Sequence, residues 1–167
     1  MKEYLRLVTV NEVEMAFEII KEAKEFLKEQ KIDQWQSGYP HMEDIKNDVT
    51  NNKGYFLISN NKIISYFCLD FDGERAYDSL KGSWKSNQKY VVVHRIATKT
   101  EYRKKGMTKV IFSLIEELCR NKGINSIRID TDEKNNIMLH TLNKNGFEYC
   151  GTIWFDNSIK IAYEKLL

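Results

Sequence analysis

The segment that decides the fold runs from Val91 to Lys122 and reads VVVHRIATKTEYRKKGMTKVIFSLIEELCRNK. Its first residues are mostly apolar, which predicts a central strand over about 90–97. A basic turn, Arg103–Thr108, follows and leads directly into an amphipathic helix. The first amides of a helix lack intrahelical acceptors and lie at the positive end of the helix dipole. This order of strand, basic glycine turn and helix predicts a site for a phosphorylated small molecule.

Apolar periodicity and turn residues predict the elements around this segment. We expect helices at 11–30, 40–49, 107–122 and 135–144, and strands at 5–10, 55–59, 63–70, 127–130, 147–150 and 158–163. Asn11 and Glu14 are expected to form the capping box of the first helix, and Pro40 to start the second. Residues 72–87 lack periodicity apart from a short helix near 77–80. The strand–helix–strand–helix order of the second half implies parallel strands, and the flanking hairpins make the sheet mixed, so the class is α/β or α+β.

Composition excludes several functional classes. The 167 residues carry 26 basic and 24 acidic side chains, a net charge of +2, which is too balanced to indicate nucleic acid as a partner. No apolar run reaches membrane-spanning length and the start does not read as a signal peptide, so we expect a cytoplasmic protein without a membrane partner. The three cysteines and three histidines are scattered, so neither a disulfide framework nor a metal site is expected. We expect one domain over 1–167, as a monomer or homodimer.

Several short motifs follow one another at the spacing of a known family. The turn Arg103–Thr108 stands where that family has [Q/R]-x-x-G-x-[G/A], and Ile129–Thr131, Asn135, Met138 and Asn145–Phe147 follow at matching distances. Over residues 90–150 the chain resembles the GNAT N-acetyltransferase superfamily, whose members use acetyl-coenzyme A. The resemblance implies a mixed central sheet with a splayed pair of parallel strands flanked by helices. It also implies an N-acetyltransferase in which an amine attacks acetyl-coenzyme A directly within a ternary complex.

The resemblance further implies which residues bind the cofactor. Backbone amides of the basic turn would hold the pyrophosphate, the end of the central strand would pair with the pantetheine arm, and an asparagine would bond nearby. Glycine in the turn lets the backbone approach an anion closely. The expected cofactor contacts are Ile96, Ala97, Thr98, Arg103, Lys104, Lys105, Gly106, Met107, Thr108 and Asn135.

Two positions depart from the family pattern. Thr108 ends the turn where the family has glycine or alanine. Leu142 stands where many members have a tyrosine that protonates the departing thiolate, and leucine cannot donate a proton. Either another group serves, or the thiolate leaves unaided, since an ordinary thiol has a pKa of about 8.5. The second departure supports an alternative function, a non-catalytic coenzyme A-binding sensor or interaction module.

The amine acceptor must lose a proton before it attacks, which calls for a general base. His94, Asp70 and Asp130 are the candidates, and we expect the catalytic base to be His94 or Asp70. Strand alternation places His94 on the same face as Ile96, although a core histidine bonded to backbone is the alternative. Arg95 points the other way and needs a partner, for which we expect Asp130 on the next strand. Asp70 could also be a solvated strand end.

The resemblance implies that the loop between the first two helices lines the acceptor pocket, so the expected acceptor contacts are Trp35, Gln36 and Tyr39. The alternative is that these side chains anchor the loop to the core. The segment after Asp70 is acidic, which favours a cationic acceptor, either a small-molecule amine or a peptide amino group.

Overall fold

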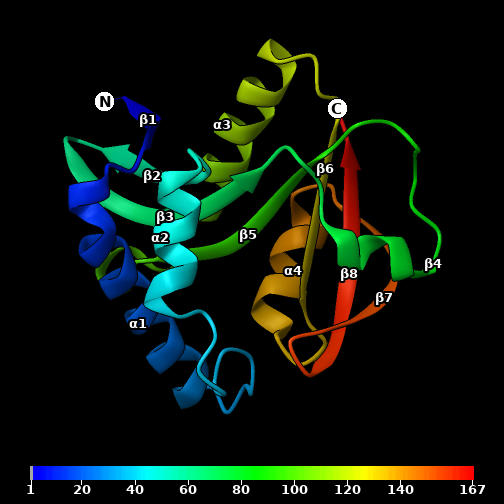
Figure 1. The fold of residues 1–167 in the computed structure, drawn as a ribbon, viewed down its shortest axis with the longest axis horizontal. Coiled ribbons are helices and arrows are strands. Elements are labelled where there is room, and N and C mark those ends of the chain that lie inside the picture. The colour runs from blue at the N-terminus through cyan, green and yellow to red at the C-terminus, as the bar shows by residue number, and fades with distance from the viewer. Residues whose placement is uncertain (1) are drawn as a thin grey trace. The chain divides into compact units, whose positions relative to one another are not determined.

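The computed structural model describes residues 2–167, which form two compact units. Of the described residues, the first unit contains 2–69 and Arg95–Leu114, and the second contains Asp70–His94 and Ile115–Leu167. Strand β5 (Val91–Thr98) and helix α3 (Met107–Asn121), both labelled in Figure 1, are each divided between the two units. None of the helices in the described part of the chain is long and apolar enough to cross a membrane.

The sheet of the first unit begins with three antiparallel strands, β1 (Glu3–Leu7), β2 (Gly54–Ser59) and β3 (Lys62–Asp70). The predicted β2–β3 hairpin is confirmed, and Asn60 and Asn61 both adopt the left-handed backbone that tight hairpins require. The second half of β5 follows β3: the Lys99 amide donates to the Ile64 carbonyl at 3.0 Å. The end of the central strand is thereby held inside this unit.

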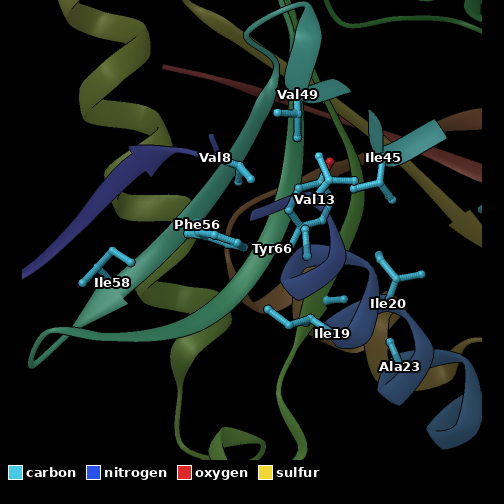
Figure 2. Close-up of a cluster of buried hydrophobic side chains, with 12 residues drawn as sticks. Val8, Val13, Ile19, Ile20, Ala23, Ile45, Val49, Phe56, Ile58 and Tyr66 are labelled. Carbon is cyan, nitrogen blue, oxygen red and sulfur yellow. The ribbon is translucent and has the colours of Figure 1, made fainter. Parts of the chain in front are cut away.

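Helices α1 (Val13–Glu29) and α2 (Met42–Thr50) bury their apolar faces against these strands. Figure 2 shows Ile19 and Ile20 of α1 on one side of the core and Phe56 and Tyr66 of the strands on the other. The residues that α1 buries recur at helical spacing: Val13, Ala16, Ile19, Ile20, Ala23 and Leu27. This spacing gives the helix one continuous apolar stripe, as the sequence predicts.

Both helices begin later than predicted. A 3₁₀ turn, Val10–Glu12, precedes α1, and the Glu12 carboxylate accepts from the backbone amide and the hydroxyl of Thr9. The expected Asn11–Glu14 capping box is therefore wrong. Arg6 bonds both oxygens of Glu12 at 2.9 Å and lowers the pKa of that carboxyl to about 2, which fixes the capping residue. Helix α2 starts after His41 rather than at Pro40, because the His41 amide donates to the Asp44 side chain.

The second unit contains a mixed sheet in the order β5, β6 (Ser126–Asp132), β8 (Ser158–Leu166), β7 (Glu148–Phe155) and β4 (Lys81–Gly82). Strands β5 and β6 are parallel, with Val91 opposite Ile127 and Val92 opposite Arg128, while the other pairs are antiparallel. Helix α4 (Asn136–Lys144) connects β6 to β7. The mixed sheet with a parallel pair confirms the predicted fold class.

Strands β6 and β8 bury charged residues that no sequence pattern predicts to be buried. Arg128 stands opposite Glu164, and Asp132 opposite Lys160, and all four side chains are buried. The segment between β3 and β5 covers this face: the Lys85 amide and the Ser86 hydroxyl donate to Glu164. Strand β6 is also longer than the predicted 127–130, since its pairing with β8 runs from Ser126 to Asp132. The covering segment also contains the short strand β4 and a 3₁₀ helix, Arg75–Ser79, which the sequence predicts only in part.

Candidate active site

The basic turn before α3 has the backbone shape of an anion site. Lys104 and Gly106 both have positive φ, 61° and 75°. The Val110 amide donates to the Gly106 carbonyl. The amides of the helical residues before Val110 therefore have no acceptor within the helix. A β-carbon added at Gly106 would meet no atom within 4 Å apart from its chain neighbours. The turn therefore offers backbone donors and open space at the same place.

The cations of the turn add a second feature that suits a phosphate. The Arg103 guanidinium stacks on the Phe26 ring at 4.3 Å, and its burial lowers the pKa of Arg103. Its Nη2 atom is buried without a hydrogen-bond partner among the described residues. Lys104 and Lys105 are exposed. A buried donor without a partner is costly, and an anion bound at this turn is the kind of group that satisfies it. The residues present thus fit a diphosphate.

Strand β5 is irregular at Arg95, between the predicted base His94 and the predicted cofactor contacts Ile96–Thr98. Arg95 has φ +53°, which interrupts the strand alternation, so the expectation that His94 and Ile96 share a face loses its basis. The Arg95 guanidinium forms an ion pair with Asp48 of α2 and donates to the Tyr39 hydroxyl at 2.6 Å. The predicted pair between Arg95 and Asp130 is wrong, because Asp48 on a helix remote in sequence supplies the carboxylate.

The three predicted acceptor residues lie in the loop between α1 and α2, where each holds the loop in place. Trp35 packs against the core of the first unit. Gln36 donates from its side chain to the Lys24 carbonyl at 2.9 Å, and Tyr39 accepts from Arg95. The Lys24 ammonium in turn donates to the carbonyls of Gly38 and Pro40. These contacts show the anchoring role that the sequence offered as the alternative, and leave acceptor binding as a prediction.

Two pairs of titratable side chains lie in the second unit. His94 Nε2 is 3.7 Å from Glu74 Oε1, and both side chains are largely buried. The Tyr77 hydroxyl donates to Asp130 at 2.7 Å. Desolvation raises the pKa of the Asp130 carboxyl to about 6, against the opposing effect of the Tyr77 hydrogen bond. Sequence reasoning missed Glu74 and Tyr77 as site residues, because both lie in the segment without periodicity.

The remaining predicted residues have observed structural contacts. Asp70 accepts the backbone amide of Asp72 at 2.8 Å, which turns the chain at the end of β3. Asn135 precedes α4 and caps it, accepting the Met138 amide at 3.1 Å. Leu142 is fully buried in α4. Across residues 2–167, no three histidine, cysteine, aspartate or glutamate side chains are grouped as a metal site would need.

Comparison with known proteins gives this geometry its context. The model of the acetyltransferase (GNAT) family matches residues 17–147, whereas no curated protein matches the chain. A GNAT-family acetyltransferase structure from Streptococcus agalactiae 2603 is 31% identical, with a TM-score of 0.88, and the match covers 99% of this chain and 95% of that one. A putative acetyltransferase from Staphylococcus aureus Mu50 is 25% identical, with a TM-score of 0.73 and 97% of both chains covered.

A more distant structure shares the fold. The aminoglycoside acetyltransferase AAC(6')-Ib, in complex with ribostamycin and coenzyme A, is 19% identical with a TM-score of 0.71, and the match covers 99% of this chain and 94% of that one. The family match over most of the chain, the mixed sheet and the open glycine turn before α3 agree with one another. The chain therefore belongs to the acetyltransferase (GNAT) family and is an acetyltransferase.

Proposed function

We propose that this acetyltransferase moves the acetyl group of acetyl-coenzyme A to an amine by direct attack in a ternary complex. The observation that carries the proposal is the turn before α3, where Gly106 leaves open space above backbone donors. We further propose that residues 1–167 act as one acetyltransferase domain, since the family match spans residues of both units.

The cofactor would be held by backbone more than by side chains. The amides of the turn would bind the pyrophosphate, and Arg103, Lys104 and Lys105 would attract it. The backbone of Ile96–Thr98 would pair with the amides of the pantetheine arm, as an added strand pairs with a sheet edge. Asn135 would contact the cofactor nearby. When bound, acetyl-coenzyme A supplies an acetyl group activated as a thioester.

Proton removal from the amine is assigned to the second unit. We assign His94 as the base, because imidazole is the side chain that ordinarily exchanges protons near neutral pH and His94 Nε2 lies 3.7 Å from the Glu74 carboxylate. Asp130 is a second candidate, since its pKa of about 6 lets it accept a proton near neutral pH. Asp70 stays a third candidate, although its carboxylate accepts a hydrogen bond from a backbone amide in the turn after β3.

The acceptor class is proposed as an amine, either a small molecule or a peptide amino group. AAC(6')-Ib, which shares the fold, was solved with the aminoglycoside ribostamycin. The acidic side chains Asp70, Glu74 and Asp130 of the second unit would favour a cation. In the first unit, Trp35, Gln36 and Tyr39 are the residues that we propose for acceptor binding.

Two measurements on the unaltered protein test this function. Calorimetric titration with acetyl-coenzyme A should show binding at a single site per chain. Thiol release, followed across a panel of primary amines and peptides, should rise above the rate without amine for at least one class. Tight binding of the cofactor without release on any amine would favour the alternative, a coenzyme A-binding module, for which buried Leu142 in place of a proton donor gives a reason.

A further inference from the structure

Strand β5 holds a backbone conformation that arginine disfavours. Arg95 lies inside the strand with φ +53°, in the left-handed region that non-glycine residues rarely adopt. The Cβ of an L-residue crowds the following carbonyl oxygen there, so the conformation persists only where surrounding contacts impose it. The residues that follow at once are Ile96, Ala97 and Thr98, whose backbone is proposed to hold the pantetheine arm. The bend therefore sets the direction of that backbone.

The contacts that can impose this bend come from the side chain of the same residue. Arg95 Nε donates to Asp48 Oδ2 at 2.9 Å, while Nη2 bonds the other carboxylate oxygen. The side chains of Arg95 and Asp48 are 14% and 6% exposed, so little water competes for the pair. Two-point binding between a planar guanidinium and a carboxylate fixes orientation as well as distance. The pair therefore fixes the side chain of Arg95 relative to α2.

Asp48 is itself held by a neighbouring strand. The Tyr66 hydroxyl of β3 donates to Asp48 Oδ2 at 2.6 Å, and Tyr66 is fully buried. Burial, together with the adjacent Asp48 charge, raises the pKa of Tyr66, so the hydroxyl keeps its proton and remains a donor. The carboxylate thus has a fixed position between a helix and a strand. A lysine in place of Arg95 could not reproduce this geometry, because its ammonium lacks the planar fork.

The same guanidinium also reaches the loop between α1 and α2. Arg95 Nη1 donates to the Tyr39 hydroxyl at 2.6 Å, so one side chain contacts α2, this loop and, through its own backbone, the strand. The loop is otherwise tied to α1 through Lys24 and Gln36. Arg95 therefore joins the proposed acceptor loop to the proposed cofactor strand.

We propose that Asp48 and Arg95 are positioning residues that hold β5 in its bent form, align the backbone of Ile96–Thr98 for the cofactor, and tie Tyr39 to that strand. This inference rests on the proposed function, since it gives the bend a task only if Ile96–Thr98 bind the pantetheine arm. It predicts that cofactor affinity depends on the backbone conformation at position 95, beyond any effect on the stability of the fold.

A matched pair of double variants separates the bend from the side chain. Asp48→Asn/Arg95→Gly and Asp48→Asn/Arg95→Ala both remove the buried charges, but only glycine adopts positive φ without strain. In calorimetric titration with acetyl-coenzyme A, the glycine variant should bind roughly tenfold more tightly than the alanine variant, which corresponds to about 1.4 kcal/mol for the left-handed conformation. Circular dichroism would establish that both variants are folded. Equal dissociation constants would overturn the proposed role of the bend.

Tyr39→Phe tests the loop contact in a protein that keeps the buried ion pair, and it decides the matter if the double variants do not fold. Acetyl-coenzyme A should slow amide hydrogen exchange in residues 33–41 of the unaltered protein. In Tyr39→Phe this slowing should be lost, while the slowing over residues 103–110 stays. Equal slowing over residues 33–41 in the two proteins, or none in the unaltered one, would overturn the inference. Failure of the unaltered protein to bind acetyl-coenzyme A would instead overturn the proposed function, and this inference with it.

Discussion

Replacing Gly106 with aspartate is the sharpest test of the cofactor site, because asparagine provides a control of the same shape. Gly106 has φ +75°, and a β-carbon there would meet no atom within 4 Å apart from its chain neighbours. Both substitutions therefore carry the same backbone strain, and neither crowds its β-carbon. Asparagine and aspartate are also the non-glycine residues that best tolerate this region. The two variants differ only in a negative charge beside the proposed diphosphate.

The size of the effect follows from Coulomb's law. A carboxylate about 5 Å from one phosphate charge, at the effective dielectric constant of roughly 20 that suits a protein surface, is repelled by about 3 kcal/mol. That free energy corresponds to a loss of affinity of roughly two orders of magnitude. The shared strain at position 106 costs both variants about 1–2 kcal/mol of folding stability, and it is present with and without the cofactor. We therefore expect Gly106→Asp to bind acetyl-coenzyme A about 100-fold less tightly than Gly106→Asn.

Calorimetric titration of both variants with acetyl-coenzyme A, at low and at high salt, measures this difference. The gap between the variants should narrow as salt rises, because screening weakens charge repulsion at an exposed turn. Thermal unfolding should give nearly equal midpoints for the two variants. Dissociation constants that agree within twofold would refute the reasoning, since they would mean that no phosphate approaches the turn.

Three further predictions address the base, the pH dependence and the fold. His94→Ala should lower the rate of thiol release at pH 7 by about 100-fold with less than a twofold change in the dissociation constant of acetyl-coenzyme A; unchanged turnover would remove His94 from the reaction. Desolvation raises the pKa of Asp130 to about 6, above its unfolded value near 3.9, so the folded state binds the extra proton and stability falls as pH rises between these values. Asparagine does not titrate, so the melting temperature of Asp130→Asn minus that of the unaltered protein should increase as the pH rises from 4 to 7. A difference that stays constant over this range would contradict the raised pKa. Gly82→Ala should destabilise the fold by about 2 kcal/mol or more in urea unfolding, because its β-carbon would lie 2.1 Å from the Cys150 carbonyl oxygen at φ +145°; an unchanged midpoint would show that the β4–β7 contact does not form.

The parts of the site that lie along one stretch of chain could be predicted from the sequence. The strand over Val91–Thr98, the glycine turn and the helix from Met107 all lie where the periodicity places them. Apolar spacing and the turn glycine are local signals, and each acts over a few residues. The order of these elements, with the hairpins on either side, was enough to indicate the family and the mixed sheet.

The charge partners could not be predicted, and Arg95 shows why. Its partner was expected on the next strand, on the assumption of a regular strand, but φ +53° interrupts that regularity and Asp48 lies 47 positions away. Glu74 and Tyr77 were missed for a related reason, since they lie in a segment without periodicity and meet His94 and Asp130 only after folding.

The amino-acid sequence by itself determined the helices, the main strands and the glycine turn before α3, because each is set by the preferences of neighbouring residues. Only the tertiary structure decided which buried charges pair. Strand register and helix packing bring together Arg95 with Asp48, and Arg128 with Glu164, across tens of residues. In a low-dielectric interior a charge is stable only beside its partner, so these pairs depend on the whole fold and no local pattern specifies them.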